Sequence, residues 1–114
     1  MLLAQTPAVP IATAAAPAGK LAVVWTSGDS EVALNVYFMY THNARKLKWF
    51  DEIDLIVWGP SAALLAKSPE LQAELKSMIA DEIKVDACLA CADRYKATET
   101  PRKMGIDVNP LGRL

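Results

Sequence analysis

The only two cysteines of the chain stand three residues apart, in the segment Cys88-Leu89-Ala90-Cys91. Thiols at this spacing can form a redox couple, supply part of a metal site, or carry sulfur as a persulfide beside a second thiol. They can also be small apolar residues that fill a core. The spacing alone leaves these alternatives open, so the rest of the chain must narrow them.

Metal binding and thioredoxin-like redox chemistry agree poorly with the rest of the sequence. A structural zinc ion takes four ligands, and the cysteine pair supplies two. The only histidine, His42, falls inside a predicted helix, where an exposed or interface side chain is the plainer interpretation. A thioredoxin-like motif follows the first strand of its unit, whereas this one follows the third. No GxGxxG or P-loop motif is present, so we expect neither a metal nor a bound cofactor.

The better position for chemistry is that of Cys88, because it falls where a predicted strand meets a predicted helix. Free backbone N–H groups and the positive end of the helix dipole stabilise a thiolate at such a junction. Cys91 lies one turn further along the helix, close enough to pair with Cys88 or to resolve an adduct on it. We therefore predict a catalytic thiol at Cys88, with Cys91 in a secondary role.

The elements that position these thiols alternate between strands and helices. Continuous apolar runs predict strands at 21–26, 53–58, 83–87 and 106–108. Helical patterns lie between them, including a long helix over 31–48. This alternation implies a parallel sheet covered by helices on both faces, with right-handed crossovers. The predicted class is a small flavodoxin-like three-layer α/β sandwich.

Ligands of such sheets bind at the carboxyl ends of the strands. Besides the cysteine segment, two loops leave the predicted strands at that edge, Ser27-Gly28-Asp29 and Gly59-Pro60-Ser61. With strand order 2-1-3-4, Cys88 would lie beside the first of these loops. We therefore expect six residues to line a pocket next to the thiols: Ser27, Gly28, Asp29, Gly59, Pro60 and Ser61.

The helix at 31–48 is apolar on two sides. One face carries Val32, Val36, Met39 and Leu47, and another carries Leu34, Tyr37 and Phe38. A helix that is apolar most of the way round is buried on more than one side. We therefore expect a homo-oligomer whose interface includes the face with Leu34, Tyr37 and Phe38.

Composition sets the outer limits. The chain has 114 residues, of which 53% are hydrophobic, and its net charge is −1. This charge gives no reason to expect nucleic acid or a membrane as a partner. We predict a flexible Ala/Pro-rich leader at residues 1–19, with a clipped signal peptide as the alternative, and a single domain at 20–114. Two closely spaced cysteines are typical of intracellular thiol chemistry, so we expect a cytoplasmic protein.

Four segments taken in order resemble the DsrE/DsrF-like family of small sulfur-relay proteins: "VVWTSGDSEVALNVYFMYTHNA", "IDLIVWGPSAALLAKSPELQAELKSM", "IKVDACLACADRY" and "MGIDV". The resemblance covers roughly residues 20 to 112. It implies a YchN-like α/β fold that assembles into homo-oligomers, often trimers or hexamers. Relatives continue into an apolar last strand, whereas this sequence ends at Leu114, so we expect either a sheet without its last strand or a chain that is truncated at this end.

The resemblance also implies a function. In sulfur-relay members a cysteine after the third strand accepts sulfur as a persulfide, and Cys88 matches that position; Cys91 has no equivalent in many of them. We therefore expect a sulfurtransferase-like persulfide carrier with sulfur-donor and sulfur-acceptor proteins as partners. The alternative is a non-catalytic oligomeric module of the same fold that binds a small ligand at the strand ends.

Overall fold

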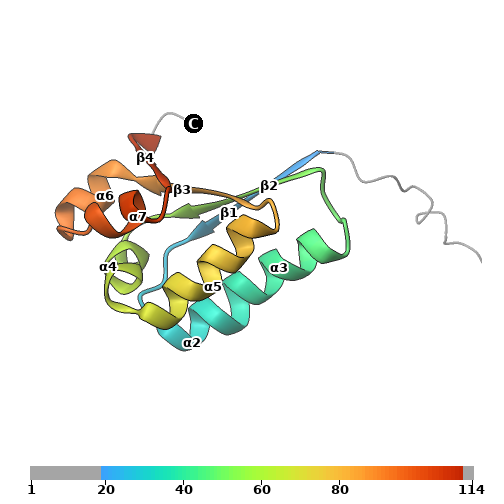
Figure 1. Ribbon diagram of the computed structural model, residues 1–114, viewed down its shortest axis with the longest axis horizontal. Helices are drawn as coiled ribbons and strands as arrows, with labels where there is room; N and C mark the ends of the chain where they lie inside the picture. Colours follow the sequence, from blue (N-terminus) through green and yellow to red (C-terminus); the bar gives the residue numbers. More distant parts are fainter. Residues whose placement is uncertain (1–18, 112–114) are drawn as a thin grey trace, which may run out of the picture.

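Four parallel strands form one sheet in a computed structural model that describes residues 19–111 (Figure 1). The strands are β1 (Lys20–Trp25), β2 (Glu52–Val57), β3 (Lys84–Cys88) and β4 (Asp107–Asn109). Each begins and ends within about a residue of its predicted position. The predicted class is confirmed: an α/β fold with an all-parallel four-stranded sheet, consistent with a flavodoxin-like sandwich. Apart from Gly19, the predicted leader lies outside the described residues.

Helical segments connect the strands. The first connection comprises α2 (Ser30–Val32), η3 (Ala33–Phe38) and α3 (Met39–Lys46), and the second comprises α4 (Pro60–Lys67) and α5 (Pro69–Ala80). The third comprises α6 (Leu89–Arg94) and α7 (Glu99–Lys103). Ser68 separates α4 from α5, and its hydroxyl oxygen caps α5 by accepting a hydrogen bond from the Leu71 N–H at 3.2 Å.

The strand order differs from the expected 2-1-3-4. The observed order is β1-β2-β3-β4, so each strand pairs with its neighbours in sequence, as roughly two-thirds of sequential strands do. Strand β2 therefore separates β1 from β3. Cys88, at the end of β3, neighbours the loop after β2 instead of the Ser27-Gly28-Asp29 loop.

This order also decides where the helices lie. Right-handed crossovers that all advance in one direction place their helices on the same face of the sheet. Helices α3 and α5 lie side by side beneath the sheet in Figure 1, on the face to which Leu55 and Val57 contribute core side chains. In the described part of the chain, Ala22, Val24 and Lys84 are exposed on the opposite face. In the described residues, helices α3 and α5 thus cover one face of the sheet, and the other face, where helices were also expected, is partly open.

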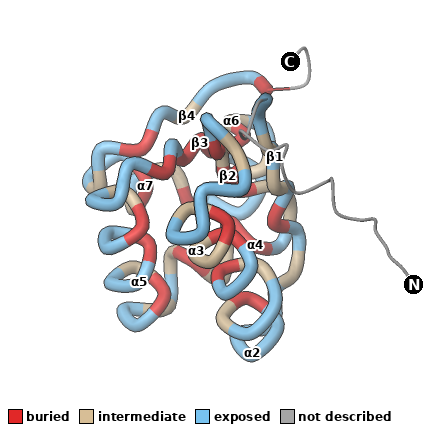
Figure 2. Tube along the Cα trace, turned by 90° about the vertical axis from the view of Figure 1, so that its right-hand side faces the viewer, coloured by how far each residue is buried: buried red, intermediate tan, exposed pale blue. Residues whose placement is uncertain are grey.

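The core lies between the sheet and these helices. Trp25 at the end of β1 packs edge-on against Phe38 of η3, with ring centroids 4.9 Å apart, and both residues are buried. Leu71, Leu75 and Met78 of α5 are also buried, and Figure 2 shows buried and exposed positions alternating along that helix. Helix α5 thus has one apolar face inward and a polar face outward, as its sequence pattern predicts.

The predicted long helix is continuous from Ser30 to Lys46, with π-helical turns at Ala33–Phe38. The prediction of which face is free is wrong. Phe38 is buried, and Leu34 and Tyr37 pack against the core. The exposed apolar face is the other one, with Val32, Val36, Met39 and Leu47. Both faces are apolar, so only packing against the sheet could distinguish them.

Candidate thiol site

Cys88 lies at the predicted junction. It is the last residue of β3 and the N-cap of α6, with extended backbone angles. Its side chain is only 3% exposed, whereas Cys91 is partly exposed, and both thiols are free. A small apolar cluster surrounds them: Ile56, Trp58 and Leu111. Cys91 is therefore the thiol that solvent reaches, and Cys88 lies beneath it.

Some neighbours of Cys91 raise the pKa of its thiol and others lower it. Burial is the largest influence and raises the pKa of the Cys91 thiol. The side chain of Cys88, which hydrogen-bonds to Cys91, raises this pKa further. A hydrogen bond from the Gly59 backbone and the charge of Arg94 lower it, but they do not offset burial. The site as it stands therefore favours the protonated thiol of Cys91.

The loop after β2 supplies the backbone next to Cys91. Gly59 has φ 72° and ψ −140°, a conformation that glycine adopts without strain, and Pro60 follows at the start of α4. The loop after β1 touches this one, because a β-carbon added to Gly28 would lie 3.2 Å from Cβ of Pro60. The loop after β2 thus stands between the thiols and the Ser27-Gly28-Asp29 loop.

Two of the predicted pocket residues instead hold the backbone. The Ser61 hydroxyl is buried, donates to the Trp25 carbonyl oxygen at 2.6 Å and accepts from the Trp58 N–H at 3.0 Å. The Asp29 carboxylate caps the first helix, accepting from the N–H groups of Glu31 at 2.8 Å and Val32 at 3.0 Å. These bonds occupy both side chains.

The structure therefore divides the predicted site. Gly59 meets Cys91, while Ser27 lies in the β1 loop, where its hydroxyl accepts from the Asp29 N–H at 3.0 Å. Sequence reasoning missed Arg94 and Leu111. Arg94 could have been found, since it lies three residues after Cys91 on one helix. Leu111 follows β4 and packs on the cluster through a long-range contact that no local pattern signals.

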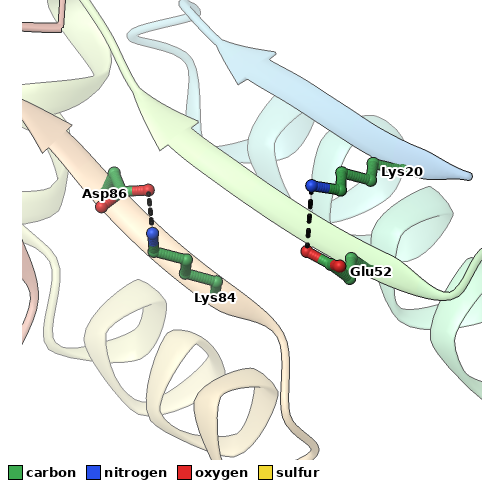
Figure 3. A network of polar contacts seen from close by, with 4 residues as sticks. All are labelled: Lys20, Glu52, Lys84 and Asp86. Atoms are coloured by element: carbon green, nitrogen blue, oxygen red, sulfur yellow. Dashed lines mark ion pairs between the residues drawn. The ribbon is translucent and has the colours of Figure 1, made fainter. Parts of the chain in front are cut away.

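A hollow of about 470 Å³ opens at the other edge of the sheet, by the amino ends of the strands. Its lining is mostly charged and includes Lys20, Glu52 and Lys84. Lys20 pairs with Glu52, and Lys84 pairs with Asp86 beside the hollow, each at 3.7 Å (Figure 3). Asp54 also lines this hollow. Burial raises the pKa of its carboxyl to about 7, the neighbouring Asp86 carboxyl adds to the rise, and Lys84 opposes it.

His42 lies away from the thiols. Its Nε2 is 3.3 Å from Asp81 Oδ2, so it links α3 to the end of α5. Within residues 19–111, no group of three or more His, Cys, Asp or Glu side chains lies close enough to hold a metal ion. Within the same residues, no helix combines the length and the apolar character needed to cross a bilayer.

No family model and no curated protein matches the chain. A solved structure is similar: BT1422 from Bacteroides thetaiotaomicron, described as a conserved protein of unknown function. The two chains are 29% identical and superpose with a TM-score of 0.77, over 82% of this chain and 80% of that one. The likeness supports the fold of almost the whole described region. It assigns no function, because the similar protein has none assigned.

Proposed function

We propose that this protein is a cytoplasmic, sulfurtransferase-like sulfur carrier of the DsrE/DsrF-like type, which takes up sulfane sulfur on its Cys88–Cys91 pair. The observation that carries the proposal is the pair of free thiols in contact at the carboxyl edge of the sheet, one buried and one partly exposed. A donor can reach the outer thiol, while the inner one stays shielded.

The sequence alone favours Cys88 as the persulfide site, but the burial of Cys88 makes Cys91 the better entry point. The Cys91 thiolate attacks the outer sulfur of a donor persulfide, R–S–SH. A bond forms between the Cys91 sulfur and that outer sulfur, the donor S–S bond breaks, and the donor leaves as the thiolate R–S⁻. The Gly59 hydrogen bond stabilises the Cys91 thiolate during attack. The product is a persulfide on Cys91.

Cys88 gives this persulfide two fates. An acceptor protein can attack the outer sulfur and remove it, which regenerates the Cys91 thiolate. Without an acceptor, the Cys88 thiolate attacks the inner sulfur of Cys91, a Cys88–Cys91 disulfide forms, and hydrogen sulfide leaves. Neither route needs an external oxidant. Partners of the protein are then a sulfur-donor protein, a sulfur-acceptor protein and further copies of itself in a homo-oligomer.

The test is intact-protein mass spectrometry after incubation with a small-molecule persulfide donor. The wild-type chain should gain one sulfur atom, then lose it as hydrogen sulfide and end as a disulfide. The variant Cys88→Ser should gain the sulfur and keep it, because it lacks the resolving thiol. The variant Cys91→Ser should gain little.

Two results would count against this assignment. If Cys91→Ser takes up sulfur at the wild-type level and Cys88→Ser does not, the acceptor is Cys88, as the sequence alone suggests. If neither single variant changes uptake, or the wild-type chain takes up none, the pair is not a sulfur site. Circular dichroism of each variant separates these outcomes from a loss of fold.

The burial of Cys88 favours a second candidate, an oligomeric module of the same fold that binds a small ligand without chemistry. A buried thiol beside Ile56 and Leu111 also has the surroundings of a core residue. This candidate predicts no sulfur uptake and no change in fold when both cysteines are replaced by serine or alanine. The mass measurement therefore discriminates between the two functions.

A further inference from the structure

The first helix presents an exposed apolar stripe on the side turned away from the sheet. The stripe consists of Val32 (37% exposed), Val36 (54%), Met39 (50%) and Leu47 (60%). Successive members are four, three and eight residues apart. Asn43 fills the gap four residues after Met39, and Tyr40 with Trp49 flanks the stripe. We call the four apolar residues, together with Asn43, Tyr40 and Trp49, the seam. Their spacing is that of a helix that packs along another helix.

The neighbouring helix has no such stripe. Helix α5 lies beside α3 on the same face of the sheet (Figure 1), and its outward residues are polar or small: Glu70, Ala73, Glu74, Lys76 and Ser77. That outer surface suits water. The outer surface of the first helix does not, because it concentrates large apolar side chains in one continuous row.

The charges at the two ends of the seam have opposite signs. Glu31 lies at the amino end and is exposed, and Lys46 and Lys48 lie exposed at the carboxyl end. Among the described residues, none of these three side chains takes part in an ion pair. A surface that is apolar in the middle, acidic at one end and basic at the other is complementary to itself when turned around.

We propose that the seam is a twofold interface with a second copy of this chain, in which the two first helices pack antiparallel. This arrangement places Val32 opposite Leu47 of the partner copy and Val36 opposite Asn43, with Met39 and Tyr40 at the twofold axis. It sets Glu31 beside the partner's basic end and pairs the helix dipoles head to tail. A parallel arrangement would instead place like charges together.

Asn43 specifies the register of this interface. A single polar residue inside an apolar helix seam costs some stability but fixes which residues face each other. In the described structure its amide lies 3.2 Å from the Met39 sulfur, so it lies along the seam itself. The proposal does not depend on the sulfur chemistry, since the thiols lie at the carboxyl edge of the sheet.

Self-association is tested by light scattering on the full chain. The wild type should have at least the mass of a dimer, and Val36→Glu should dissociate it at the same concentration. Ala73→Glu is the matched control: it adds the same charge to the exposed face of α5 and should leave the mass unchanged. Circular dichroism checks that each variant is folded. A monomeric wild type, or a Val36→Glu variant that assembles like the wild type, overturns the proposal.

Disulfide trapping tests the direction of the helices in a chain whose Cys88 and Cys91 are replaced by serine. Met39→Cys lies at the axis and should cross-link to its own copy on oxidation. Val32→Cys should not, because antiparallel packing separates the two copies of this position by about 22 Å along the helix. Cross-linking of Val32→Cys, or none of Met39→Cys in the assembled protein, overturns the antiparallel arrangement.

Charge reversal gives a third readout. Glu31→Lys should weaken association several-fold, since it places lysine beside the partner's Lys46 and Lys48. Adding Lys46→Glu and Lys48→Glu to the same chain restores opposite charges and should recover most of the association. In a parallel pair, Glu31→Lys would leave like charges facing each other and would change association little, which would overturn the proposal.

Discussion

The Ser61 hydroxyl donates a hydrogen bond to the Trp25 carbonyl oxygen at 2.6 Å, joining the ends of two neighbouring strands. It also accepts from the Trp58 N–H at 3.0 Å, and the whole side chain is buried. The residue thus closes the carboxyl edge of β1 and β2 and holds Gly59 in position beside Cys91.

Ser61→Ala should lower the free energy of unfolding by about 0.5–1.5 kcal/mol, because it removes a buried hydrogen bond while the Trp58 N–H and the Trp25 carbonyl oxygen keep their own bond at 3.0 Å. Urea unfolding followed by circular dichroism measures the change. Ser77→Ala on the exposed face of α5 is the control and should stay within about 0.5 kcal/mol of the wild type. Equal stability of the two variants would show that the hydrogen bonds of the Ser61 hydroxyl do not stabilise the fold.

Substitutions of Asp29 test whether this residue serves only as a helix cap and lies outside the thiol site. Asp29→Ala should lower the free energy of unfolding by about 0.5–2 kcal/mol, because the first helix loses its N-cap. Asp29→Asn keeps an acceptor oxygen and should cost less. Alkylation of Cys91 should be as fast in both variants as in the wild type. A clear change in that rate in Asp29→Asn would show that Asp29 belongs to the thiol site.

The sequence predicted well what local chemistry decides. The apolar run at 53–58 became β2 as expected, and the helix caps formed by Ser68 and by Asp29, which was expected to line the pocket, rest on equally local contacts. Each of these depends on residues within a few positions of each other, such as an acceptor oxygen two or three residues before a free N–H. The positions of Cys88 and Gly59 at the carboxyl edge follow from the same local signals.

What the sequence left open depends on contacts between distant residues. Nothing local states whether β1 or β2 lies next to β3, so the neighbours of Cys88 could not be derived. Leu34 and Val36 are equally apolar, and only the packing of Leu34 against the core showed which face is free. The exposure of Cys88 was likewise undecidable, because it depends on Leu111, a residue far along the chain.

Asp54 should make stability depend on pH. Its pKa is raised from 3.8 to about 7, mainly by burial. Between these values the folded chain holds a proton that the unfolded chain has released. The contribution is therefore fully present below about pH 4 and is lost as the pH rises through about 7. Asp54→Asn should be less sensitive to pH over this range and gain relative stability at its upper end.

Urea unfolding at several pH values between those limits measures this effect. Ser77→Asn on the exposed face of α5 is the control, since it adds an amide away from Asp54 and leaves the surroundings of the carboxyl unchanged. It should retain the wild-type dependence on pH. If Asp54→Asn shows the wild-type slope as well, the carboxyl is not the group responsible.

The reactivity of Cys91 should also depend on pH. Its pKa is raised by burial and by Cys88, so its alkylation by iodoacetamide should still accelerate at a pH where an ordinary exposed thiol has reached its full rate. Peptide mapping assigns the modified residue. Cys88→Ser should move the midpoint of the rate profile to lower pH, because it removes the neighbouring thiol that disfavours the Cys91 thiolate.

Arg94 acts on the same thiol in the opposite direction. Its positive charge lowers the pKa of Cys91, so Arg94→Gln should move the midpoint of the profile to higher pH and slow alkylation at neutral pH. Arg102→Gln, an exposed residue of α7, is the control and should leave the profile in place. The shifts from Cys88→Ser and Arg94→Gln must have opposite signs. Two shifts in the same direction would mean that packing around Cys91, and not charge, governs its reactivity.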